Sequence, residues 1–144
     1  INDVLDLAKI ESGRMTLNLE PLEVQPILQA AIAQIAPLAE AKRLSLYIDV
    51  PRSLPKVEAD RIRLRQIVLN LLSNAVKFTR EGGIAVRAYP LEVTAPIEGV
   101  PLMVGSWLCV SVEDSGIGIA PENFELIFDA FRQVDGSAMR EFQG

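Results

Sequence analysis

The spacing of apolar residues predicts helices alternating with strands along most of the chain. Helical spacing recurs in three segments, residues 1–12, 27–42 and 60–80. Alternation of apolar and polar residues predicts four strands, at residues 15–19, 44–50, 84–89 and 107–113. The connection over 90–105 contains three prolines and is expected to be a long loop. This order of elements predicts an α+β fold, a two-layer sandwich with helices packed on a sheet.

Length and composition favour one globular domain. The 144 residues are 49% apolar and 23% charged, which is typical of a soluble protein with a real core. No apolar run approaches the roughly 20 residues of a membrane span, so no membrane contact is expected for this segment. The single Cys109 excludes an internal disulfide and favours a reducing, cytoplasmic compartment. Because the chain begins at Ile1 rather than Met, we expect it to be cut from a longer protein, one that could itself carry a membrane anchor.

Charge is unevenly distributed, and the net charge of −5 comes from residues 110–144. The segment 60–80 is instead basic, but it lacks interleaved aromatic residues, and the overall charge is negative. A nucleic-acid partner is therefore not expected.

The segment 60–80 carries the first candidate site. On a helix its apolar residues gather on one side, namely Leu64, Val68, Leu71, Leu72 and Ala75. Five polar residues share another arc: Arg63, Gln66, Asn70, Asn74 and Lys77. Asparagine is a poor helix former, so two of them one turn apart need a reason. A solvated face is one interpretation; the other is a site for a hydrated metal and a phosphate, because the arc offers amides and a cation.

The second candidate follows the last predicted strand, where Asp114 precedes Gly116 and Gly118. An ordinary turn would explain this pattern. Alternatively, glycines let a planar ligand lie against backbone, and a carboxylate can accept a hydrogen bond from an exocyclic amine such as that of adenine.

The third candidate is an aromatic segment with Phe124, Ile127, Phe128 and Phe131 at helical spacing. Core packing is the default interpretation. Beyond Gly136 the chain becomes polar and aperiodic, as expected for a mobile lid anchored by an aromatic hinge.

In this order the three motifs resemble the catalytic, ATP-binding domain of sensor histidine kinases, in the superfamily that also holds DNA gyrase, the heat-shock chaperone and mismatch-repair ATPases. Residues 70–79 resemble its asparagine box, 114–118 its first glycine box and 128–131 its phenylalanine box. Residues 1–14 resemble the exit from the second helix of the dimerisation and phosphoacceptor domain, which leaves 15–144 as the catalytic domain. The resemblance implies a Bergerat-type fold, a mixed sheet backed by three helices.

The resemblance also implies roles for single residues. Asn74 would bind Mg²⁺, Lys77 would contact the phosphates, and Asn70 would support the metal and phosphate end. Asp114 would accept the adenine amine. The remaining nucleotide contacts would come from Gly116, Gly118, Ile119 and Phe131. The implied reaction moves the γ-phosphoryl group of ATP to a histidine on an upstream domain of a homodimer, for relay to a response-regulator aspartate.

Two other functions stay open at this point. One is a serine kinase or ATPase of the same superfamily, which Asn70 disfavours because hydrolytic relatives place a glutamate there to activate water. The other is a degenerate, non-catalytic docking module. The chain contains no histidine, so the phosphoacceptor is expected upstream of Ile1, and the lid is expected to continue past Gly144. The chain by itself is therefore expected to be inactive as a kinase.

Overall fold

The computed structural model describes residues 2–128, which form two compact units. One unit holds Leu19–Ile117, and the other holds the segments on either side of it. The predicted α+β class is confirmed, with three helices and a mixed sheet. No helix within residues 2–128 combines the length and the apolar character needed to cross a bilayer.

A mixed sheet of three strands forms the centre of the larger unit. Strand β4 (Gly83–Val93) lies between β2 (Ser45–Asp49), its parallel neighbour, and β5 (Gly105–Asp114), its antiparallel neighbour. A separate antiparallel pair joins β1 (Glu20–Leu22) to β3 (Val57–Ala59). The register of β4 and β5 pairs Ile84 with Asp114, so β5 ends beside the start of β4.

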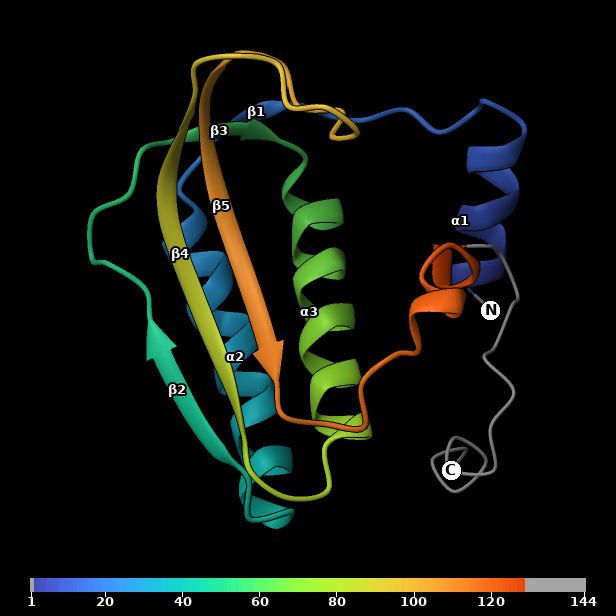
Figure 1. Ribbon diagram of the computed structural model, residues 1–144. Coiled ribbons are helices and arrows are strands. Elements are labelled where there is room, and N and C mark those ends of the chain that lie inside the picture. Colours follow the sequence, from blue (N-terminus) through green and yellow to red (C-terminus); the bar gives the residue numbers. More distant parts are fainter. Residues whose placement is uncertain (1, 129–144) are drawn as a thin grey trace. The chain divides into compact units, whose positions relative to one another are not determined.

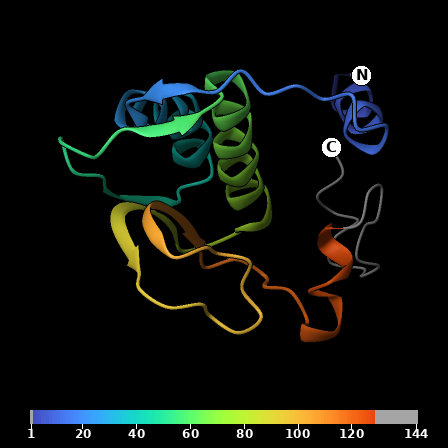
Figure 2. The ribbon, with the colours of Figure 1, turned by 90° about the horizontal axis from the view of Figure 1, so that it is seen from above.

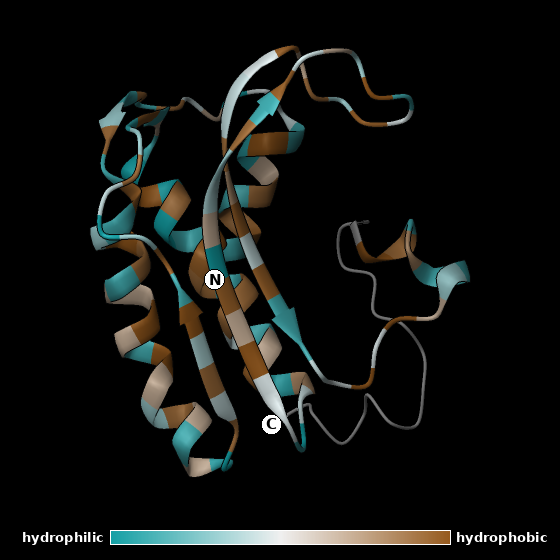
Figure 3. Cartoon of the chain, turned by 60° about the vertical axis from the view of Figure 1, so that its left-hand side comes forward, coloured by the Kyte–Doolittle hydropathy of each residue, from teal (hydrophilic) through white to brown (hydrophobic). Residues whose placement is uncertain are grey.

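Two helices, α2 (Val24–Ala41) and α3 (Arg61–Phe78), cover one face of this sheet, as Figures 1 and 2 show from two directions. The core lies between the two layers, where Leu28, Leu72 and Val86 are fully buried. Figure 3 shows hydrophobic residues alternating with more polar ones along the strands, as expected for a sheet with one buried face. The third helix, α1 (Asn2–Glu11), belongs to the other unit. Helix α1 ends before Gly13, whose φ of +64° is the left-handed conformation typical after a helix.

Helix α3 is fixed by its first turn and by its apolar side. Asp60 caps it, because the Asp60 carboxylate accepts hydrogen bonds from the amides of Ile62 (3.0 Å) and Arg63 (3.1 Å). The buried positions are Val68, Leu72, Ala75 and Val76. The prediction for Leu71 was wrong, since its side chain is 46% exposed. Leu71 lies three residues before Asn74, so it occupies the flank of the helix between the polar arc and the apolar side.

The predicted strand over 15–19 is also wrong. Among the described residues this segment pairs with no strand, and Leu17 and Leu19 are exposed, whereas the next three residues pair with β3. Sequence periodicity missed β3 because three residues are too few to show alternation.

The hairpin strands are longer than predicted, and β4 runs through Pro90. Proline interrupts a strand when its missing N–H is needed by a neighbour. Here β2 pairs with β4 only as far as Arg87. Beyond Arg87, Pro90 therefore interrupts no hydrogen bonds between β4 and β2. The connection therefore shrinks to residues 94–104.

The aromatic segment differs from its prediction. Within residues 121–128 the structure has two short 3-10 turns, Pro121–Asn123 and Leu126–Phe128, rather than an α-helix. Phe124 is exposed, which contradicts core packing at that position. Phe131 and the expected lid lie outside the described residues.

Candidate functional site

The exposed side of α3 presents the predicted polar arc. Asn70, Asn74 and Lys77 are all exposed, as the helical spacing predicted. Arg63 and Gln66 are half-buried and hydrogen-bond one another at 3.0 Å, so they act as an intrahelical pair. Within the part of the chain that the structure describes, the amide side chains of Asn70 and Asn74 form no hydrogen bond. Both amides are therefore left for a ligand or for solvent.

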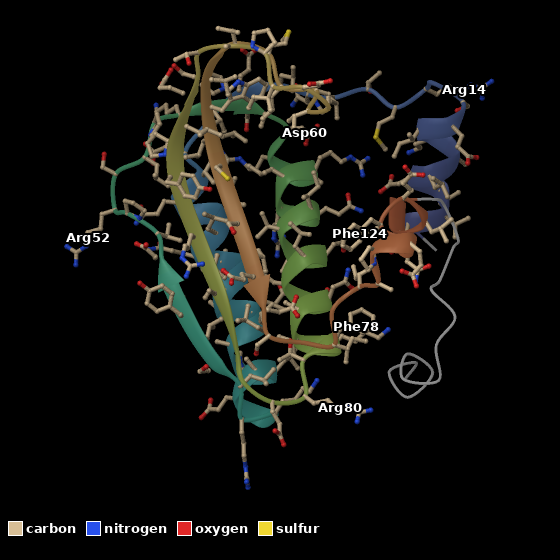
Figure 4. The ribbon with its side chains drawn as sticks, viewed as in Figure 1. Arg14, Arg52, Asp60, Phe78, Arg80 and Phe124 are labelled. Atoms are coloured by element: carbon tan, nitrogen blue, oxygen red, sulfur yellow. The ribbon has the colours of Figure 1, made fainter. Side chains whose placement is uncertain are left out.

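The last turn of α3 is held by helix α2. The ammonium group of Lys42 donates hydrogen bonds to the carbonyl oxygens of Val76 (2.6 Å) and Lys77 (3.3 Å). These carbonyls have no partner inside the helix, and a cation suits the negative end of the helix dipole. The side chain of Lys77 extends over the ring of Phe78, with Nζ 5.5 Å from the ring centroid. Figure 4 shows Phe78 at this end of α3 and Asp60 at the other.

Asp114 is placed on the helix-facing side of the sheet by the register of β5. Its backbone pairs with Ile84, which is 2% exposed, and paired residues share a face. The Asp114 oxygen Oδ1 accepts hydrogen bonds from the amide of Gly116 (2.8 Å) and from the hydroxyl of Thr79 (3.5 Å). The carboxylate therefore lies just beyond the C-terminal end of α3.

The glycine turn packs directly against the end of α3. A Cβ atom at Gly116 would lie 2.5 Å from the Phe78 carbonyl oxygen and 2.5 Å from Asp114 Oδ1. The amide of Ile117 donates to the same Phe78 carbonyl at 3.3 Å. Only glycine fits a backbone approach this close, so the sequence signal at Gly116 has a steric basis.

Ser115 fastens the other side of the turn to the start of β4. Its hydroxyl accepts from the amide of Gly83 (3.0 Å) and donates to the carbonyl of Glu81 (3.3 Å), and its amide donates to the Gly83 carbonyl (3.1 Å). Gly82, with φ of +104°, leaves room for this hydroxyl, which a Cβ atom would overlap. The turn after Asp114 is thus held on one side by the start of β4 and on the other by the end of α3.

The structure brings together two of the three predicted constellations. The turn at Asp114 and Gly116 contacts Phe78 and Thr79, which follow Asn74 and Lys77 at the end of α3. Gly118, with φ of +71°, and the exposed Ile119 belong to the other unit and are not placed relative to this junction. Sequence analysis assigned no role to Lys42 or Thr79. A lysine just after one helix and a threonine just after another carry no periodic signal.

A hollow of about 280 Å³ lies on the opposite face of the sheet, lined by Tyr47, Arg87 and Glu113 among others. An ion pair of 2.8 Å joins Arg87 to Glu113, and the guanidinium lies 5.5 Å from the centre of the Tyr47 ring. Asp114 and Ser115 also line this hollow, so it reaches the glycine turn.

Comparison with known families decides the identity. Residues 59–144, more than half of the chain, match the family described as histidine kinase-, DNA gyrase B- and HSP90-like ATPase. The chain belongs to this family. The resemblance drawn from the three motifs is thereby confirmed, and the matched region contains both constellations that meet at the end of α3.

Relatives of this ATPase domain include sensor kinases. The chain is 40% identical over 142 residues to the sensor protein GacS of Pseudomonas syringae pv. syringae, covering 98% of the chain and 15% of GacS. It is 41% identical over 145 residues to the non-motile and phage-resistance protein of Caulobacter vibrioides, covering all of the chain and 16% of that protein. The chain thus spans only about a sixth of the length of these relatives.

Solved structures agree with the fold. The structure of full-length ShkA in complex with AMPPNP is 36% identical, with a TM-score of 0.73 over 96% of this chain and 27% of ShkA. The complex of histidine kinase ThkA with the response regulator TrrA has a TM-score of 0.64 over 92% of this chain and 38% of that chain. Its 21% identity supports the fold alone.

Proposed function

We propose that this domain binds ATP and transfers its γ-phosphoryl group to a histidine on a phosphoacceptor domain of the same, longer protein. The observation that supports the proposal is the contact of the turn at Asp114 and Gly116 with the end of α3, the helix that carries Asn74 and Lys77. In the proposed site the amides and the cation lie at the phosphate end and the carboxylate lies at the base end. ATP needs this polarity, with cationic partners at its phosphates and an acceptor at its base.

Asp114 and Gly116 fit the base. The carboxylate accepts the exocyclic amine of adenine, while the glycine lets the turn lie against the end of α3 with no side chain between them. Gly118, Ile119 and Phe131 are proposed to complete the nucleotide contacts. The AMPPNP complex of ShkA, an ATP-analogue complex at 36% identity, supports a nucleotide site here.

Asn74 fits Mg²⁺ as a ligand, because Mg²⁺ prefers oxygen donors and keeps several waters. Within residues 2–128 no group of three or more His, Cys, Asp or Glu side chains could hold a metal. A magnesium ion at α3 would therefore take few protein ligands and complete its shell with phosphate and water. When bound, Mg²⁺ neutralises part of the phosphate charge. In the proposed site Lys77 adds a second positive charge, and Asn70 orients the phosphates.

The neutral amide of Asn70 favours transfer over hydrolysis. An amide cannot accept a proton from water at neutral pH, so it cannot serve as a general base. We propose that the acceptor is a histidine, with a response-regulator aspartate as the next acceptor and a homodimer as the full-length assembly. Helix α1 is proposed to be the end of the phosphoacceptor domain, within residues 1–14, with 15–144 as the catalytic domain. The relatives named as sensor kinases support a histidine as the acceptor.

The experiment joins this chain to a histidine-bearing phosphoacceptor domain and supplies γ-labelled ATP with Mg²⁺. We expect an acid-labile, base-stable label on the acceptor, as phosphohistidine gives. The Asn74→Ala variant should lose the label, and Ser73→Ala, on the same helix, should keep it. Release of free phosphate with no labelled protein would instead favour an ATPase. Failure to bind ATP in the joined protein would favour a docking module.

A further inference from the structure

Thr79 is a buried polar residue at the end of helix α3. It follows α3 directly, in an extended conformation with φ of −104° and ψ of 121°, and its side chain is 0% exposed. Among the residues that the structure describes, no other polar or charged side chain is classed as buried. A buried hydroxyl requires a hydrogen-bond partner, and Asp114 Oδ1 at 3.5 Å supplies it.

Both hydrogen bonds made by the Asp114 side chain end on one oxygen. Oδ1 accepts from the Gly116 amide at 2.8 Å and from the Thr79 hydroxyl at 3.5 Å. The Thr79 hydroxyl follows α3 along the chain, and the Gly116 amide follows β5. Because these two separate segments bond the same oxygen, they restrict rotation of the carboxylate. Oδ2 forms no hydrogen bond within residues 2–128, so it is the oxygen available to a ligand.

The support for Thr79 is itself rigid. The carbonyl of its neighbour Phe78 accepts from the Ile117 amide, and Lys42 holds the carbonyls of the two residues before that. The hydroxyl therefore keeps a fixed position relative to the glycine turn. Because the Thr79 hydroxyl is a donor in a fixed position, it sets the orientation of the exposed Asp114 carboxylate.

We propose that Thr79 is a positioning residue for base selectivity: its hydroxyl orients Asp114 so that Oδ2 faces the 6-amino group of the purine. This inference rests on the proposed role of Asp114 as the acceptor of that amine. Thr79 touches no nucleotide in this scheme and acts only through the carboxylate.

The test compares two ligands that differ in the amino group, ATP and purine riboside 5′-triphosphate. Their dissociation constants are measured by calorimetry for the whole chain and for variants whose folding is checked by urea unfolding. Thr79→Val keeps the shape and removes the hydroxyl. Thr79→Ser keeps the hydroxyl and removes the methyl. Thr94→Val, in the exposed connection between β4 and β5, is the matched control.

We expect Thr79→Val to weaken ATP about threefold to tenfold, the effect of one long hydrogen bond to a charged group, and to leave the analogue unchanged. Thr79→Ser should keep the preference for ATP even where it lowers stability. In an Asp114→Ala background, Thr79→Val should have no further effect on the ratio. If Thr79→Val does not fold, the pair Thr79→Ser and Thr79→Ala gives the same comparison, because those two differ only in the hydroxyl.

Three results separate this inference from the proposed function on which it rests. If wild type prefers ATP and Asp114→Ala loses the preference while Thr79→Val keeps it in full, the positioning role is wrong and the adenine role of Asp114 stands. A loss of preference in Thr79→Ser equal to that in Thr79→Val would also overturn it, since packing would then be the cause. If wild type does not distinguish the two nucleotides, the proposed role of Asp114 itself is wrong.

Discussion

The ammonium group of Lys42 lies 2.6 Å from the carbonyl oxygen of Val76, so the end of α2 holds the end of α3. The second bond of Lys42, to the carbonyl of Lys77 at 3.3 Å, is to a residue proposed to contact phosphates. The helix that carries the site thus depends on a side chain from a neighbouring element, and this dependence can be measured.

Replacement of Lys42 by Met should lower the free energy of unfolding by about 1–2 kcal/mol, because two carbonyls at the end of α3 lose a charged donor at a half-exposed position. Urea unfolding measures the change. Lys56→Met, at an exposed lysine before β3, is the control and should change stability little. Equal stability of both variants would show that solvent serves these carbonyls as well as Lys42 does.

Replacement of Asp114 by Ala should weaken ATP binding selectively. Losing a hydrogen bond to a charged acceptor costs about 1.5–3 kcal/mol, roughly a 10- to 150-fold loss of affinity. Titration of wild type and variant with ATP and GTP measures it, because GTP carries no amino group at the same ring position. The exposed Asp49, on β2, provides the control Asp49→Ala. Unchanged ATP affinity in Asp114→Ala would remove the adenine role.

Replacement of Asn74 by Ala should reduce the gain in ATP affinity that Mg²⁺ produces. We expect a loss of about 1.5–3 kcal/mol, if the contact of the amide oxygen with the cation resembles a hydrogen bond to a charged group. Calorimetry with and without Mg²⁺ on both proteins gives the difference. The fold should be unaffected, because Asn74 is exposed. A Mg²⁺ effect as large in the variant as in wild type would exclude Asn74 as a ligand.

The pair of Tyr89 and Cys109, opposite one another on β4 and β5, gives a prediction about pH. A hydrogen bond with the Cys109 side chain, followed by the charge of Cys109, raises the pKa of Tyr89 above its usual 10. The native state then holds the phenolic proton to higher pH than the unfolded state does. This contribution to stability is complete below about pH 10 and is lost as the pH rises through the raised pKa.

Cys109→Ala should therefore bring the pKa of Tyr89 back toward 10. Ultraviolet titration of the phenolate measures it in a Tyr47→Phe background, where Tyr89 is the one remaining tyrosine. Ser111→Ala, also on β5, serves as the control. An unchanged titration after removal of the thiol would show that burial rather than Cys109 sets the pKa.

Sequence reasoning predicted best where the determinants are local. The helix predicted over residues 60–80 is α3, Arg61–Phe78, and the exposure of Asn70, Asn74 and Lys77 follows from helical spacing alone. It failed where the presence of a partner strand decides whether a segment forms a strand. Residues 15–19 alternate like a strand but have none, while β3 forms from three residues because β1 lies beside it.

Local patterns in the sequence predicted the two halves of the candidate site: a polar arc along one helix and a carboxylate followed by glycines. Each half consists of residues close together along the chain, so helical periodicity and turn preferences indicate it. Only the tertiary structure decided that the halves meet, because the register of β5 against β4 and the packing of α3 on the sheet carry Asp114 to Thr79. The same non-local contacts gave Lys42 and Thr79 their places. A hydrogen bond between residues more than thirty positions apart depends on the whole fold, and no local pattern encodes it.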